Sequence, residues 1–196
     1  MHSVCFPETL VASFAEVLPD RTRVEIGMIG REGIIGWPVL LGTAHSPHSG
    51  IVQLAGGEAL SLPAGKLVEL CSAHAALHTA LLRFVQSFTV QMGRTIVANL
   101  RDTIDRRLAR WIVMLHDRID GDTLAITHQC LADALGVRRA SVTDGLHIME
   151  GNGVLRCTRA LVVVRDRAKL VALAGPSYGA AEASYSTLIA PFGRAA

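Results

Sequence analysis

The sequence predicts an α+β protein with an N-terminal β-rich region, one long helix and a C-terminal helical unit that ends in a hairpin. Three observations predict this. Short apolar runs separated by Gly, Pro, Asp and Ser fill residues 4–63. Apolar residues then recur every three or four positions over 72–100. Two short helical patterns followed by a hairpin pattern occupy 124–164.

Composition excludes several classes of protein. Of the 196 residues, 50% are apolar and 18% are charged, which is typical of a chain that buries a core. No apolar run is long enough to cross a membrane, and the N-terminus lacks the basic flank and apolar stretch of a signal peptide. The four cysteines have no CxxC spacing, which favours reduced thiols over a zinc site or a disulfide scaffold. We therefore expect a cytoplasmic protein with no membrane partner.

Basic charge is concentrated in the second half of the chain. Residues 1–93 hold five basic and seven acidic side chains, whereas residues 94–196 hold fourteen and ten. Seventeen of the nineteen basic residues are Arg, whose forked guanidinium matches phosphate groups and guanine edges. A GC-rich genome would produce the same preference for Arg. The charge pattern therefore favours a nucleic-acid partner only mildly.

The β-rich region contains a regular series of glycines. Gly27, Gly30, Gly33 and Gly36 recur every third residue and lead into Trp37-Pro38. A dinucleotide-binding loop would open a helix at this point, so this class of site is excluded. The strand patterns are 10–14, 24–29, 51–54 and 59–62, with a hairpin turn at 18–21.

The helix expected over 72–100 would be about 40 Å long, which exceeds the width of a small domain. Its narrow apolar stripe needs a partner. The stripe could cover the β-rich region of the same chain, or it could form a two-stranded seam in a homodimer. We expect the homodimer, with an interface formed by Leu81, Val85, Phe88, Met92 and Ile96. A second helix is expected over 103–118, with its arginines mostly on the outer face.

The region after residue 124 predicts a helix-turn-helix. Thr127 is a suitable N-cap for a helix over 128–135, and Gly136 can adopt the conformation that ends it. A second helix follows over 138–150. Its N-terminal half has an exposed face of a kind that enters the major groove of DNA. The residues expected to contact bases are Arg138, Arg139, Ser141 and Thr143.

A basic β-hairpin follows the second helix, over 154–164, and resembles the wing of a winged helix. Arg156 and Arg159 lie near its tip and suit phosphate contacts, as do Thr127 and His128 at the start of the first helix. The alternative is a helical pair packed on a hairpin with no role in DNA binding.

Three segments together resemble the Crp/Fnr family of bacterial transcription regulators. Residues 27–36 resemble the glycine-rich turn of the family's cyclic-nucleotide-binding-like β-roll. Residues 107–111 resemble the start of the helix that follows the dimerisation helix, and residues 126–155 resemble the family's winged helix.

The resemblance implies a homodimer that regulates transcription, with no catalytic activity. It implies a β-roll sensory-like domain, a dimerisation helix, a winged-helix DNA-binding domain and a C-terminal tail, which we assign to 1–72, 73–102, 103–174 and 175–196. The partners implied are a second copy of the chain and palindromic double-stranded DNA, with RNA polymerase as a further candidate. Two recognition helices would lie about 34 Å apart in successive major grooves.

The chain also departs from the family's pattern. It starts inside the β-roll, so we expect either a shortened roll or a true start upstream of Met1. Where cyclic-AMP-binding members have an Arg-Ser pair this chain has His48-Ser49, and only Cys5 is available for an N-terminal iron–sulfur cluster. We expect neither cyclic AMP nor any other cofactor. In the recognition helix Arg139 is kept, but Ala140 and Asp144 replace a Glu and an Arg, so the preferred bases should differ.

Two other functions stay open. A cupin-like enzyme would need three or four metal ligands, and the candidates are His45, His48 and either Glu32 or Glu58, without a recognisable spacing. A signalling adaptor could keep this fold after losing DNA binding.

Overall fold

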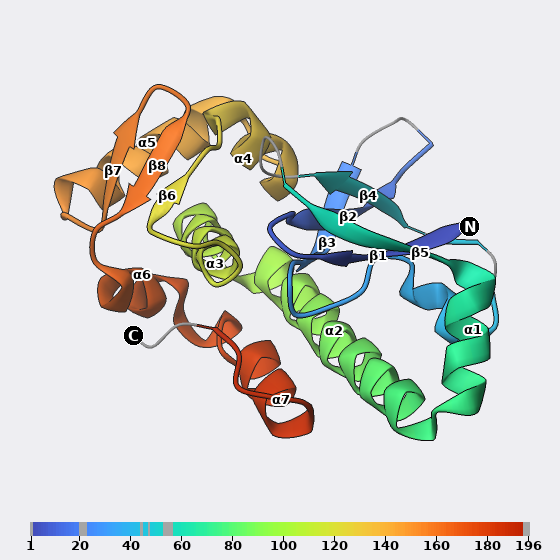
Figure 1. Cartoon of the computed structure of the whole chain (residues 1–196). Helices are drawn as coiled ribbons and strands as arrows, with labels where there is room; N and C mark the ends of the chain where they lie inside the picture. The colour runs from blue at the N-terminus through green and yellow to red at the C-terminus, as the bar shows by residue number, and fades with distance from the viewer. Residues whose placement is uncertain (1, 20–22, 44, 47, 53–56, 194–196) are drawn as a thin grey trace.

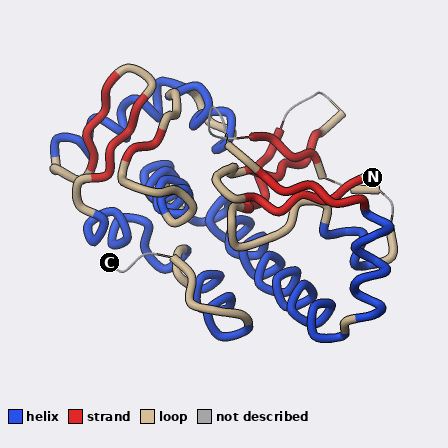
Figure 2. Tube along the Cα trace, viewed as in Figure 1, coloured by secondary structure: helices blue, strands red, loops and turns tan. Residues whose placement is uncertain are grey.

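The computed structural model describes residues 2–19, 23–43, 45–46, 48–52 and 57–193, and it confirms the α+β class (Figure 1). The chain forms two units. Small sheets and two helices make up the N-terminal unit, and a bundle of short helices with a β-hairpin makes up the C-terminal unit. A last helix returns from the C-terminal unit to the long helix of the N-terminal one (Figure 2).

The described residues of the N-terminal unit form two antiparallel sheets. Strand β1 (Ser3–Pro7) pairs with β5 (Ala59–Pro63), while β2 (Ala12–Val17) lies between β3 (Arg23–Ile29) and β4 (Ser49–Val52). The turn expected at 18–21 joins β2 to β3 and falls partly outside the described residues, as does the end of the strand expected at 51–54. Strand β1 was not among the strands expected.

The helical part of this unit is broken where a continuous pattern was expected. Helix α1 (Ala64–Ala73) ends before His74, whose φ of −129° and ψ of 88° are not helical, and α2 (Ala75–Arg101) follows. The expected start at residue 72 was therefore wrong, because α1 begins directly after β5. Both helices pack against the sheets and against a short 3-10 helix, η1 (Trp37–Leu41).

An aromatic cluster fills the space between α2 and the sheets. The ring of Phe88 lies 5.7 Å from that of Phe14, 6.0 Å from Trp37 and 6.1 Å from Phe84, measured between centroids. A glycine permits the close approach of this helix, since a Cβ atom at Gly33 would lie 2.2 Å from a ring carbon of Phe84. Gly27 and Gly33 of the glycine repeat thus serve packing against α2.

This packing corrects the expected face of α2. Phe88 is 2% exposed and belongs to the core of its own chain, and Leu81, Val85 and Met92 pack around that core. Of the five residues expected at a dimer interface, only Ile96 is on the open side, where it is 58% exposed. Phe88 therefore belongs to the core of its own chain, as in the alternative interpretation, and Leu81, Val85 and Met92 are half-buried beside it.

The C-terminal unit has one core shared by all its elements. Its helices are α3 (Ile104–His116), α4 (His128–Leu135), α5 (Arg139–Gly151) and α6 (Arg167–Ala174). Strand β8 (Leu161–Val164) pairs with β6 (Thr123–Leu124) on one side and β7 (Leu155–Thr158) on the other. Apolar side chains from these elements, with Val11 and Met28 of the N-terminal unit, form a continuous buried cluster.

Two expectations about this half were wrong. Arg110 and Arg118 are 7% and 3% exposed rather than on the outer face. Arg110 Nε donates a hydrogen bond to the carbonyl of Ser177 (3.0 Å), so its charge is accommodated by polar partners inside the fold. The segment expected to be a tail contains η2 (Gly175–Ser177) and helix α7 (Ala180–Leu188), which packs along α2.

Candidate nucleic-acid interface

The helix-turn-helix forms because each of its boundaries has a suitable residue. The hydroxyl oxygen of Thr127 accepts a hydrogen bond from the N–H of Cys130 (3.1 Å), which caps α4 as expected. Gly136 has a φ of 62°, a left-handed conformation that favours glycine, and it ends α4. Three residues later α5 begins at Arg139.

Helix α5 has a buried face and an open face. Val142, Leu146 and Met149 are at most 2% exposed, and Gly145 lets the helix approach α3 closely, since a Cβ atom there would lie 2.8 Å from Asp105 Oδ1. The opposite face near the start of the helix is exposed. Its exposed residues include Arg138, Arg139, Ala140, Asp144 and His147.

A side-chain bridge joins the starts of α4 and α5. His128 Nδ1 lies 2.9 Å from Thr143 Oγ1, and the Thr143 hydroxyl also lies 3.1 Å from the carbonyl oxygen of Arg139, to which it donates. His128 Nδ1–H is then the donor to Thr143. Partial burial lowers the pKa of His128, and the positive charge of Arg139 lowers it further. No sequence pattern pointed to this bridge, in which Thr143 has a structural partner.

The wing is held against α5 by a second bridge. Glu150 Oε1 accepts a hydrogen bond from the N–H of Cys157 on β7 (3.0 Å). Arg156 on β7 and Arg159 in the turn are exposed. Ala160 completes this turn with a φ of 59°. The hairpin therefore presents two exposed guanidinium groups beside α5.

The expected contact residues thus fall into three groups. Arg138 and Arg139 lie exposed at the start of α5, and Ser141 lies half-buried in its first turn. Thr127 and His128 lie at the start of α4, with Thr127 used as the cap. Arg156 and Arg159 lie on the wing, so positive charge flanks the open face of α5.

One face of α2 points away from the rest of the chain and has exposed apolar residues towards its two ends. Leu82, Ile96, Val97 and Leu100 are 36%, 58%, 41% and 80% exposed. Positions 82, 86, 89, 93, 96 and 100 alternate steps of four and three residues, which is the spacing of a two-stranded coiled coil. Gly93 lies on this face with open space around it. We call these six positions the open stripe of α2.

The described residues contain no group of three or more His, Cys, Asp or Glu side chains placed to hold a metal ion. His48 instead lies 2.7 Å from Glu16, Nδ1 to Oε1, and its ring lies 6.5 Å from that of Trp37. In this part of the chain, His45, His48, Glu32 and Glu58 therefore form no such group. The helices within it include none that is both long and apolar enough to span a bilayer.

Comparisons with known proteins agree with the helix-turn-helix and with the overall fold. Residues 106–173 match a family model described as a Crp-like helix-turn-helix domain. No curated protein sequence matches the chain.

Solved structures with the same fold come from several bacteria. A CRP-family transcriptional regulator from Thermus thermophilus is 19% identical with a TM-score of 0.65, and 91% of each chain is covered. A Crp/Fnr-family protein from Eubacterium rectale is 13% identical with a TM-score of 0.66, covering 88% of this chain and 81% of that one. FixK2 from Bradyrhizobium japonicum is 16% identical with a TM-score of 0.62, covering 88% and 87%.

Proposed function

We propose, from the premise that this chain carries a Crp-like helix-turn-helix domain on a Crp/Fnr fold, that it is a homodimeric regulator of transcription. It binds a palindromic DNA site in the cytoplasm and does so without cyclic AMP. The observation that supports this most strongly is the open face of α5. It presents two adjacent Arg side chains at the end of the helix that enters a major groove.

Base contacts are assigned to the start of α5. Arg139 is exposed in the first turn and can fork onto the O6 and N7 atoms of guanine. Arg138 is the N-cap residue, about 100° away around the helix, and is assigned to the DNA backbone or a neighbouring base. Ser141 and Thr143 are secondary candidates. Ser141 is half-buried, and Thr143 would have to share its hydroxyl with His128.

Phosphate contacts are assigned to the flanks of α5. Arg156 and Arg159 on the wing extend into solvent, and the N-terminus of α4 at Thr127 and His128 presents backbone N–H groups. Contacts of this kind set the position of the protein on the duplex and carry no sequence information.

Self-association is assigned to the open stripe of α2. A helix with exposed Ile96 and Leu100 has apolar area to bury, and a second copy offers the same stripe about a two-fold axis. The small residues Thr89 and Gly93 in its middle allow the two helices to approach closely.

Independence from cyclic AMP is supported by the packing of the sheets. Phe14, Trp37, Phe84 and Phe88 occupy the space between α2 and the sheets. His48, at the place where a phosphate-binding Arg would be expected, lies with its Nδ1 2.7 Å from Glu16 Oε1.

Selection of genomic fragments bound by the purified protein tests this function. We expect an inverted repeat whose half-sites lie about one helical turn apart, as two α5 helices of a symmetric dimer require. Fragments without a shared motif would instead favour the signalling adaptor, and a single unrepeated half-site would contradict the dimer.

A further inference from the structure

The chain returns to the N-terminal unit after completing the C-terminal one. Residues 179–193, which we call the C-terminal strap, comprise α7 and the segment that follows it. Helix α7 packs along α2, with Ala181 buried at the contact and Arg83 Nη1 donating a hydrogen bond to the carbonyl of Leu188 (3.3 Å). In Figure 1 the strap bridges the space below α3. It thus contacts the helix of one unit directly after leaving the other.

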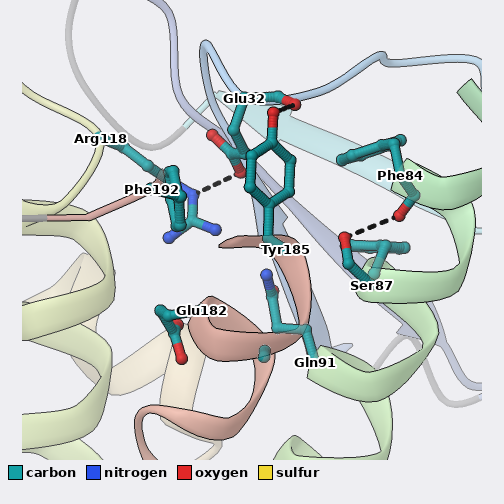
Figure 3. Close-up of a pocket in the computed structure, with 10 residues that line it drawn as sticks. Glu32, Phe84, Ser87, Gln91, Arg118, Glu182, Tyr185 and Phe192 are labelled. Atoms are coloured by element: carbon teal, nitrogen blue, oxygen red, sulfur yellow. Dashed lines mark hydrogen bonds and ion pairs between the residues drawn. The ribbon is translucent and has the colours of Figure 1, made fainter. Parts of the chain in front are cut away.

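The strap covers an ion pair that joins the two units (Figure 3). Arg118, just after α3, places Nε 2.8 Å from Glu32 Oε1 in the glycine-rich turn, and these side chains are 1% and 5% exposed. The hydroxyl of Tyr185 donates to the backbone carbonyl of Glu32 (2.9 Å). The ring of Phe192 lies 5.1 Å from the Arg118 guanidinium carbon and 5.1 Å from the Tyr185 ring.

Enclosure by the strap determines the strength of this pair. Two further polar atoms of the pair also have partners: Arg118 Nη1 donates to the carbonyl of Met114 (2.7 Å), and Glu32 Oε2 accepts from the N–H of Gly30 (3.0 Å). A hydrogen-bonded ion pair shielded from water holds its geometry well. The same pair opened to solvent would contribute little to holding the two units together.

The strap leaves both proposed binding surfaces free. Arg138, Arg139 and His147 on α5 are exposed with the strap in place. So are Ile96 and Leu100 on the open stripe of α2. A segment that masks neither surface does not act as a plug. Its contacts with Glu32 and Arg118 lie across the two units, which the short connection at 102–103 joins between α2 and α3.

We propose that the C-terminal strap positions the DNA-binding unit, with Tyr185 and Phe192 as its positioning residues. The strap holds the unit in a DNA-competent orientation without any effector. If the unit were free to reorient, only a fraction of molecules would be competent, and the apparent affinity for DNA would fall by that fraction. The DNA arm of this inference rests on the proposed function, whereas the restriction of the connection does not.

Hydrogen exchange of the purified full-length protein and of strap variants tests the proposal. The variants are a chain ended after Tyr178, Phe192→Ala, Phe192→Tyr, which keeps the ring, and Thr187→Ala on the exposed side of α7. The amides to follow are those of Asp102 and Arg107, which bond to the carbonyls of Ala98 and Thr103. Affinity for a selected DNA fragment is measured in parallel.

We expect the shortened chain and Phe192→Ala to exchange at least about tenfold faster at these amides, while the amides of α5 stay as protected as before. DNA binding should weaken about tenfold, as for a competent fraction of about one in ten. Phe192→Tyr and Thr187→Ala should match the intact chain in both measurements.

Unchanged exchange at the amides of Asp102 and Arg107 in both the shortened chain and Phe192→Ala would overturn the proposal, whatever happens to DNA binding. Tighter DNA binding after removal would also overturn it, because the strap would then be a mask. If amides throughout the shortened chain exchange rapidly, that chain has unfolded. The exchange of the Phe192→Ala variant then decides whether the strap restricts the connection. If the intact chain binds no DNA, the proposed function fails, and the exchange result still decides the role of the strap.

Discussion

The indole Nε1 of Trp111 donates a 2.7 Å hydrogen bond to Glu25 Oε1, joining α3 of the C-terminal unit to β3 of the N-terminal one. Glu25 is buried at this junction, and burial raises its pKa to about 8, against the opposing hydrogen bonds from Trp111 and Ser13. The contact is therefore formed by a carboxyl group that is largely protonated at neutral pH.

Glu25 should make stability depend on pH. Because its pKa is raised on folding, its contribution is fully present below pH 4.5, the unfolded value, and is lost as pH rises to about 8. Within this window the free energy of unfolding should fall by up to about 1.4 kcal/mol per pH unit from this group. Glu25→Gln keeps the shape and cannot ionise, so its slope should be flatter in urea unfolding at several pH values. Parallel slopes for the two proteins would contradict the assignment.

The open stripe of α2 should contain the dimer seam. Ile96→Asp with Leu100→Asp would place charges in an apolar seam, and we expect the dimer dissociation constant to rise at least about a hundredfold, close to 3 kcal/mol. Sedimentation velocity measures this. Leu41→Asp, at a residue 57% exposed on η1, is the matched control and should stay dimeric. A dimer that survives the double change would place the seam on another face.

The glycine repeat should be intolerant of a side chain where α2 comes close. Gly33→Ala would place a Cβ atom 2.2 Å from Phe84 Cε2, and we expect a loss of about 1–3 kcal/mol in the free energy of unfolding. Gly65→Ala on α1 meets nothing within 4 Å and should instead gain about 0.5–1 kcal/mol. Urea denaturation compares the two, and equal effects would mean that the close approach is absent.

The wing arginines should position DNA without reading it. Arg156→Ala and Arg159→Ala should each weaken binding to all sequences alike and reduce the salt slope by about one. Fluorescence anisotropy over a range of salt concentrations measures both quantities. A changed base preference in either variant would mean that the wing enters a groove.

Elements with local signals could be predicted from the sequence. Thr127 and Gly136 mark the ends of α4 through their own backbone chemistry, so the helix-turn-helix was found close to its observed limits. The wing was found for the same reason. Positions of side chains such as Arg139 follow directly once a short helix is placed between such boundaries.

Features that depend on distant partners could not be predicted in the same way. Helix α2 carries apolar residues on two faces, and periodicity alone does not tell which face the chain itself covers, so the face expected for Phe88 was wrong. Arg118 is buried because Glu32, 86 residues away, neutralises it. Helix α7 is short and rich in Ala and Ser, and its packing on α2 becomes apparent only in the fold.

Helix α5 should read base edges through its first turn, and the proposed function depends on this most. Binding of the Arg139→Ala and Arg138→Ala variants to a DNA library varied at every position of the selected site tests it most directly. We predict that Arg139→Ala costs about 1–3 kcal/mol and flattens the preference for one guanine in each half-site, while Arg138→Ala lowers affinity and keeps that preference. Loss of the guanine preference in Arg138→Ala, with its retention in Arg139→Ala, would contradict this assignment.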